Sequence, residues 1–202
     1  VNVLHIMNAN LMLILGSSST FRQQQLKTLG LSFQVAKPDF DETPQSNETP
    51  YETALRLALG KEHSLVTQYP QHLIIGADQV AWCNSRQLGK PMSVLKAQQM
   101  LAELSGQRIE FYSAVCLLNT LSGSLHTHVD TTIVTMRPLT DVQISQYLKR
   151  EPDAIYCAGA AKSEGLGSAL LSNIESSDPN ALIGLPIFKL IDFLSAEGIN
   201  VL

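Results

Sequence analysis

The stretch Met12–Gly16, with the sequence MLILG, runs directly into Ser17-Ser18-Ser19-Thr20 and then into the polar segment Phe21–Leu29. The apolar run is too short for a helix and predicts a buried strand. The small polar residues predict a turn, and a helix that Gly30 closes follows it. A strand, a turn and a helix N-terminus in this order expose backbone N–H groups and the positive end of a helix dipole, which suits phosphate. A serine-rich turn that only caps a helix is the alternative.

The other apolar patterns along the chain predict an α/β fold with a mixed β-sheet flanked by helices. The β-rich runs 109–118 and 125–136 flank a turn that contains Gly123, and they predict a long hairpin. We expect one continuous domain over residues 12–202 with a cleft between two lobes, preceded by a poorly ordered extension over residues 1–11. Further strands are predicted at 33–36 and 73–80, and further helices at 50–68, 93–104, 140–149 and 186–197.

Composition excludes several classes of protein. The 202 residues are 45% hydrophobic and 16% charged, as in a globular enzyme and unlike a disordered chain. A net charge of −4 argues against a nucleic-acid-binding protein. No run approaches the roughly 18 apolar residues of a membrane span, and the run 11–15 lacks the cationic flank of a signal peptide. Three widely spaced cysteines predict free thiols. We therefore expect a cytoplasmic protein without nucleic-acid or membrane partners.

Charged residues interrupt the predicted strands and helices at positions that suit phosphate chemistry. Asp78 interrupts the strand 73–80, where a carboxylate is costly unless it is paired, hydrogen-bonded or bound to a metal. At the carboxyl end of a strand it is a catalytic candidate, and a structural aspartate is the alternative. Lys61 lies on the inward face of its predicted helix, and Lys90 follows a strand in a Gly-Lys-Pro turn. With Arg22 they match the charge of a triphosphate, although each lysine could also be a surface residue.

Metal ligands are harder to identify from the sequence. Asp41 and Glu42 lie in the proline-bounded loop DFDETP and offer oxygen ligands, with solvated surface carboxylates as the alternative. His126 and His128 lie two residues apart on a predicted strand. Because no third ligand is near them in sequence, we expect an exposed strand face there and not a metal site.

Taken together, these segments resemble the Maf family of nucleoside-triphosphate pyrophosphatases. The segments are SSSTFR, the DET loop, LALGK, IIGADQV, LGKP, AGAAKSEGLG and DPNALIGLP, and their order and spacing match from about Met12 onward. The resemblance implies a Maf-like fold related to that of inosine triphosphatase, and cleavage between the α and β phosphates. It also implies a divalent cation, Mg²⁺ or Mn²⁺, and a homodimer, since dimers are frequent in the family.

The expected reaction is single-step hydrolysis, in which Asp78 accepts the proton of the attacking water or holds the ion that activates it. The remaining residues are expected to bind phosphate, base or metal. Catalytic residues are predicted at Asp78, Lys61, Lys90 and Arg22, substrate-binding residues at Ser17, Ser19, Phe21, Gln79 and Glu164, and metal ligands at Glu42 and Asp78.

One departure from the family pattern concerns the base. Where the family has a proline and two arginines, this chain has Thr20, Phe21 and Arg22. An aromatic residue there, together with Gln79 and the segment 162–165, is similar to the subgroup that removes 7-methyl-GTP in a house-cleaning role. An aromatic face attracts the cationic methylated guanine, and Glu164 can accept from the N–H donors of guanine. We expect pyrimidines to be rejected because a buried Glu164 carboxylate would stay unpaired.

Three alternatives remain open on the sequence. A phosphatase could use Asp78 as a covalent nucleophile and release orthophosphate step by step. A nucleotide-sensing protein that regulates cell division could bind without turnover. A pyrophosphatase could prefer another nucleotide, such as dTTP or UTP.

Overall fold

The computed structural model describes residues 11–43 and 45–202. The predicted extension 1–11 therefore lies outside the described residues, apart from Leu11. The described chain forms a seven-stranded mixed sheet with five α-helices, so the predicted fold class is confirmed. The strands are β1 (Leu13–Gly16), β2 (Phe33–Ala36), β3 (Leu73–Cys83), β4 (Arg86–Leu88), β5 (Arg108–Asn119), β6 (Leu125–Met136) and β7 (Leu171–Glu175). The helices are α1 (Thr20–Lys27), α2 (Pro50–His63), α3 (Val94–Leu104), α4 (Asp141–Arg150) and α5 (Ile187–Ala196).

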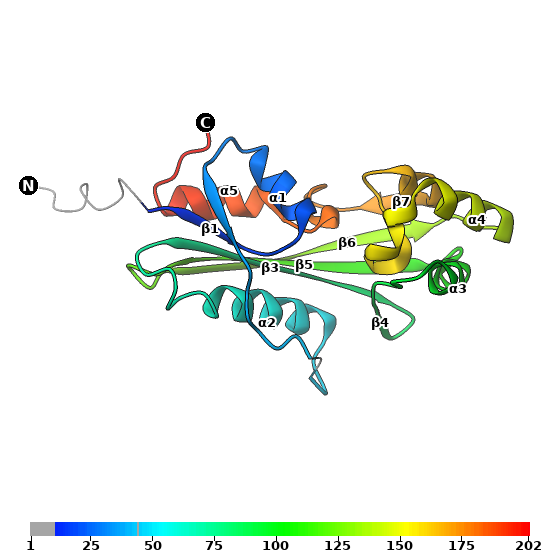
Figure 1. Cartoon of the computed structure of the whole chain (residues 1–202), viewed down its shortest axis with the longest axis horizontal. Coiled ribbons are helices and arrows are strands. Elements are labelled where there is room, and N and C mark those ends of the chain that lie inside the picture. The colour runs from blue at the N-terminus through cyan, green and yellow to red at the C-terminus, as the bar shows by residue number, and fades with distance from the viewer. Residues whose placement is uncertain (1–10, 44) are drawn as a thin grey trace, which may run out of the picture.

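The sheet has the order β2-β1-β3-β5-β6-β7, with β4 pairing to β3. β1 runs parallel to both β2 and β3, whereas β5, β6 and β7 continue the sheet with antiparallel pairs. Figure 1 shows α2 below the sheet and α1 and α5 above it at one end, with α3 and α4 at the other end. The long strands β3, β5 and β6 connect the two ends.

Separate hydrophobic cores occupy the two ends. Leu26 of α1 and Leu190 and Leu194 of α5 are fully buried against apolar residues of β1, β3 and β5. At the other end, residues of α3 and α4 pack against the start of β5 and the end of β6, the part of the hairpin farthest from its turn. Each helix thus covers only part of the sheet, and the strands between the two cores are left to line a cleft.

One edge of β3 changes its partner along its length. It pairs with β1 from Leu73 to Gly76 and with β4 from Ala81 to Cys83. Residues 77–80 lie between these two ladders and pair with neither β1 nor β4. The chain leaves β1 at Gly16 and β4 at Leu88, so the loops after both strands begin beside this gap. The polar loops singled out in the sequence therefore converge on one place.

Most element boundaries follow the capping signals in the sequence. The Thr49–Glu52 and Thr140–Gln143 capping boxes begin α2 and α4 as predicted. Two predictions were wrong in extent. α2 ends at His63, and residues 64–68 continue as turns with i→i+3 hydrogen bonds such as Leu65 N to Glu62 O at 3.0 Å. β3 extends to Cys83 and folds back as β4, a hairpin that the sequence analysis missed.

Candidate active site

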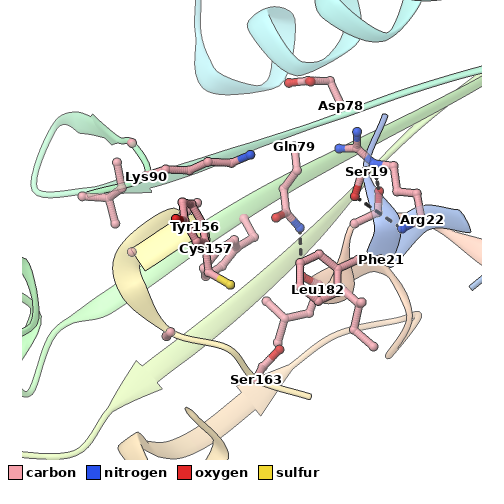
Figure 2. A pocket seen from close by; sticks show the side chains of 18 of the residues that line it. Ser19, Phe21, Arg22, Asp78, Gln79, Lys90, Tyr156, Cys157, Ser163 and Leu182 are labelled. Carbon is pink, nitrogen blue, oxygen red and sulfur yellow. Dashed lines mark hydrogen bonds between the residues drawn. The ribbon is translucent and has the colours of Figure 1, made fainter. Parts of the chain in front are cut away.

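A cavity of about 630 Å³ lies between the two cores, and Figure 2 shows it from close by. The gap in the edge of β3 forms part of its wall, together with the loops after β1 and β4. All of the residues predicted for catalysis, substrate and metal line this cavity. They are Ser17, Ser19, Phe21, Arg22, Glu42, Lys61, Asp78, Gln79, Lys90 and Glu164.

The serine loop forms the wall beside α1. Ser19 is the N-cap of this helix, and its hydroxyl accepts a hydrogen bond from the backbone N–H of Arg22 at 3.4 Å. Ser17 is buried, and its hydroxyl accepts from the backbone N–H of Ser19 at 3.2 Å. The serine loop thus caps α1 and also lines the cavity. The capping role, which the sequence left open as an alternative to phosphate binding, therefore does not exclude a binding role for the same residues.

The side chain of Arg22 lines the cavity and is held in place by two hydrogen bonds. Its Nε donates to the backbone carbonyl of Gly184 at 2.9 Å, and its Nη1 donates to Ser17 Oγ at 3.3 Å. Burial lowers the pKa of the Arg22 guanidinium, while the nearby carboxylates of Asp78 and Glu42 raise it. Arginine stays charged in proteins, so the cavity contains a fixed cation that presents N–H donors to an anion.

A second cation lines the same cavity and comes from α2. Lys61 of α2 is only 8% exposed, which confirms that it lies on the inward face of the helix. Its Nζ is 2.5 Å from Asp78 Oδ1 and 3.1 Å from Glu42 Oε2. A buried ammonium requires such partners. The ion pair links α2 to β3 and to the loop that carries Glu42, and it leaves Asp78 Oδ2 without a hydrogen-bond partner among the described residues.

Asp78 does not lie at the end of its strand, as the sequence analysis expected. β3 continues for five residues beyond it, to Cys83. Asp78 nevertheless lies two residues after Gly76, where the parallel ladder with β1 stops. Ligands in α/β sheets bind beyond the carboxyl ends of the strands. Here that rule applies to β1, which is shorter than β3 and ends at Gly16, beside Gly76.

Gln79 points to the opposite face of β3 from Asp78, because side chains alternate along a strand. Its Nε2 donates to Ser113 Oγ at 2.9 Å and approaches the carbonyls of Ala181 and Leu182 at 3.1 and 3.0 Å. Figure 2 shows the amide nitrogen directed at Leu182. Gln79 is therefore attached to the DPNALIGLP segment, which forms the cavity wall next to Phe21.

Lys90 and Glu164 lie at the rim, and both are exposed. The expectation of a buried Glu164 was wrong. The segment that carries Glu164 is held instead by its neighbour Lys162, whose Nζ is 2.9 Å from Glu151 Oε1. Because Glu164 is open to solvent, an unpaired carboxylate there costs little, and the argument for strong rejection of pyrimidines loses its physical basis.

Tyr156, Cys157 and Ser113 are among the residues that line or support the cavity and that sequence reasoning missed. Tyr156 and Cys157 lie on the wall opposite Phe21, and Ser113 lies beneath Gln79. Burial raises the pKa of the Cys157 thiol to about 11, so this thiol stays protonated at neutral pH. The one signal in the sequence was a small polar residue, Ser113, within the apolar run of β5. Its pairing in register with Gln79 is seen only in the structure.

The carboxylates of Glu42 and Asp78 provide the oxygen ligands that a divalent cation requires. Both lie within 3.1 Å of one ammonium group and line one cavity. In the described part of the chain, no group of three or more His, Cys, Asp or Glu residues is arranged to hold a metal ion. Two carboxylates fit a Mg²⁺ ion that takes its other ligands from water and from substrate phosphates, as such ions commonly do.

The two histidines lie outside the cavity and are half-buried, so the expected exposed strand face was wrong for them. His126 Nε2 is 2.8 Å from Glu197 Oε1, and its ring stacks on Phe193. This contact ties the β5–β6 hairpin to the C-terminal helix. None of the helices in the described ranges is long and apolar enough to cross a membrane.

The family model for Maf-like protein matches residues 12–197. The chain belongs to the Maf-like family. Maf-like relatives include a protein from Neisseria gonorrhoeae named 7-methyl-GTP pyrophosphatase, which is 60% identical over 196 residues, 97% of this chain and 100% of the relative. A relative from Chromobacterium violaceum with the same name is 52% identical over 190 residues, 94% of this chain and 98% of the relative. The resemblance of the sequence segments to the Maf family is confirmed.

Proposed function

We propose that this Maf-like protein hydrolyses a nucleoside triphosphate between its α and β phosphates and prefers 7-methyl-GTP. The observation that carries the proposal is the cavity at the gap in β3, where the cations Arg22 and Lys61 face the carboxylate of Asp78. The relatives named 7-methyl-GTP pyrophosphatase, 45% to 60% identical over nearly their whole length, support the reaction and the substrate.

The phosphates of the substrate bind between the serine loop and α2. Arg22 donates to phosphate oxygens from one side, and Lys90 reaches them from the rim. The Ser17 loop and the N-terminus of α1 supply further donors and a positive dipole end. These groups are positioned before substrate arrives, because Arg22 is held by Gly184 and Ser17. Preorganised donors stabilise the charge that develops on the phosphates during hydrolysis.

Asp78 is the proposed proton acceptor. A water oxygen attacks the α phosphorus, the bond to the oxygen that bridges the α and β phosphates breaks, and pyrophosphate leaves. Asp78 Oδ2 takes the proton of the water, while Lys61 holds Oδ1 and fixes the orientation of the carboxylate. A divalent ion, when bound, would neutralise phosphate charge and acidify water, and Glu42 and Asp78 would hold it.

Phe21 is the proposed platform for the base. It lines the cavity beside Gln79 and faces the wall that carries Tyr156 (Figure 2). Methylation at N7 makes guanine cationic, so stacking on Phe21 gains a cation–π contribution of about 0.5–2 kcal/mol. Glu164 accepts guanine donors at the solvated rim, where the discrimination it provides is weaker than in a buried pocket.

A nucleotide panel tests the proposal. Purified protein is incubated with Mg²⁺ and with 7-methyl-GTP, GTP, ATP, UTP and dTTP, and both pyrophosphate and orthophosphate are measured. The proposal requires equimolar nucleoside monophosphate and pyrophosphate. Stepwise orthophosphate release would indicate a phosphatase with Asp78 as nucleophile, and tight binding without product would indicate a nucleotide sensor. We also propose that the enzyme acts on free nucleotides in the cytoplasm. We further propose that it forms a homodimer, and sedimentation of the purified protein would test this oligomeric state.

A further inference from the structure

The side-chain amide of Gln79 can adopt only one of its two orientations. Two of the three oxygens around its terminal atom are backbone carbonyls, from Ala181 at 3.1 Å and Leu182 at 3.0 Å. Carbonyl oxygens only accept hydrogen bonds, so the atom that faces them must be the NH₂ group. A flipped amide would place its own oxygen against both carbonyls. The chemistry of the surrounding oxygens therefore fixes the orientation of the amide.

Ser113 supports the same orientation from the neighbouring strand. It is fully buried, and its hydroxyl donates to the carbonyl of Ala181 at 2.7 Å. Because its one hydrogen is directed there, its lone pair faces Gln79 Nε2 at 2.9 Å and accepts. Ser113 therefore ties Gln79 and the 181–182 segment into one hydrogen-bonded unit.

The segment that supplies these carbonyls is itself anchored. Asp178 is buried, and its carboxylate accepts from the side chain of Asn180 at 2.8 Å and from the N–H of Phe188 at 2.8 Å, at the start of α5. Asn180 O accepts from Gln25 of α1 at 2.7 Å. The carbonyls that hold the Gln79 amide are thus fixed by two helices, and they cannot easily turn to suit a flipped amide.

We propose that Ser113 is a positioning residue for base recognition, because it locks the Gln79 amide so that only an acceptor, Oε1, faces the bound base. This inference rests on the proposed function and deepens it. Gln79 Oε1 has no hydrogen-bond partner among the described residues, and Gln79 lines the cavity. A locked acceptor favours a base that offers N–H donors on its Watson–Crick edge, as guanine does. Adenine presents N1, an acceptor, where guanine has N1–H, so the two acceptors repel.

The test is the ratio of kcat/KM for GTP to kcat/KM for ATP in Ser113→Ala. Without the hydroxyl, the amide loses one of its three acceptors and Ala181 O loses a donor. The two carbonyls still oppose a flipped amide, but turning the NH₂ group toward adenine then costs one hydrogen bond less. We expect the ratio to fall by about two- to tenfold, which is the range for one neutral hydrogen bond, mainly through the two KM values. Ser105→Ala is the matched control, because Ser105 Oγ accepts from Leu139 N at 2.7 Å and lies outside the cavity.

A double-mutant cycle separates positioning from a general loss of stability. In a Gln79→Met background there is no amide to hold, so Ser113→Ala should change the ratio by less than about twofold. The proposal is overturned if folded Ser113→Ala keeps the wild-type ratio, loses activity equally with GTP and ATP, or has the same effect in the Met background. If the alanine variant does not fold, Ser113→Cys, a weak hydrogen-bonding group of similar size, must lower the ratio.

These outcomes are distinct from failure of the proposed function. If wild-type protein releases no pyrophosphate, the pyrophosphatase proposal fails on its own. The same ratio is then measured as dissociation constants of GTP and ATP by calorimetry. The locked amide still requires it to fall in Ser113→Ala and to stay unchanged in Ser105→Ala.

Discussion

Asp78→Asn should separate catalysis from binding and folding. The substitution keeps the shape of the side chain and an oxygen that can accept from Lys61, but it removes the charge and most of the basicity. Loss of a general base lowers rates by about 10²–10⁴-fold, and loss of a metal ligand can lower them further. We therefore expect pyrophosphate release from 7-methyl-GTP to fall by at least about a hundredfold. Nucleotide affinity should hold or rise, because one negative charge near the phosphates is gone.

The same substitution has a predictable effect on stability. Breaking a fully buried ion pair costs about 3–5 kcal/mol. Here the cost should be smaller, about 1–3 kcal/mol, because Asn still accepts from Lys61 and because Glu42 remains 3.1 Å from the ammonium. Urea denaturation measures this difference, and isothermal calorimetry measures nucleotide binding to the folded variant.

Asp130→Asn is the matched control for a lost buried carboxylate. Asp130 is 4% exposed, accepts from Ser177 Oγ at 2.6 Å and does not line the cavity. It should lose stability comparably and keep turnover within about threefold of wild type, since it carries no chemistry. A near-wild-type rate in Asp78→Asn, or an equal loss of rate in the control, would refute the role given to Asp78.

Three further predictions concern metal, base and pH. Activity should require Mg²⁺ or Mn²⁺ and disappear with excess chelator, because hard oxygen ligands at Glu42 and Asp78 suit such ions; full activity in EDTA contradicts this. The kcat/KM for 7-methyl-GTP should exceed that for GTP by a few-fold to about thirtyfold. UTP and dTTP should be lower than GTP only by a small factor, because Glu164 is exposed and its discrimination is weak. Phe21→Arg should erode the methyl preference and Glu164→Gln the guanine preference, and an unchanged order in a substrate panel counts against both. Burial raises the pKa of Glu62 to about 7, so the folded state binds a proton that the unfolded state releases near pH 4.5. Stability should therefore decrease as pH rises from about 4.5 to 7, and Glu62→Gln should gain roughly 1–3 kcal/mol in urea denaturation at pH 8 but little at pH 4.5. An equal gain at both pH values would show that the Glu62 charge is not the cause.

The sequence predicted the elements wherever a local pattern specifies them. Helix starts were correct at Thr49 and Thr140 because a capping box is a signal within four residues. The β3–β4 hairpin was missed because its turn is Asn84-Ser85, with φ values of 50° and 61°. Such turns need positive φ at both positions, and Asn-Gly is the usual sequence signal for them. Asn84-Ser85 adopts this conformation although its sequence does not predict it.

The candidate site was predicted as a set of residues but not as an arrangement. Each sequence motif indicated the site residues within its own segment, and all of these residues line the cavity. The exposure of Glu164 and the Ser113–Gln79 contact depend on how β5 pairs with β3 and on how the 178–184 segment packs. These are long-range relationships, which neither spacing nor periodicity within one segment contains.

Two glycines explain why the charged groups of the cavity meet at all. A Cβ atom on Gly76 would lie 2.2 Å from the carbonyl oxygen of Ala58, so only glycine allows α2 to pack this closely on β3. That approach is what brings Lys61, three residues after Ala58, to Asp78, two residues after Gly76. A Cβ on Gly60 would likewise lie 2.2 Å from the ring of Phe40. The ring can lie against the helix there, which places the loop so that Glu42 reaches the same ammonium. The glycines of LALGK and IIGADQV thus set the distances at which the charged residues next to them interact.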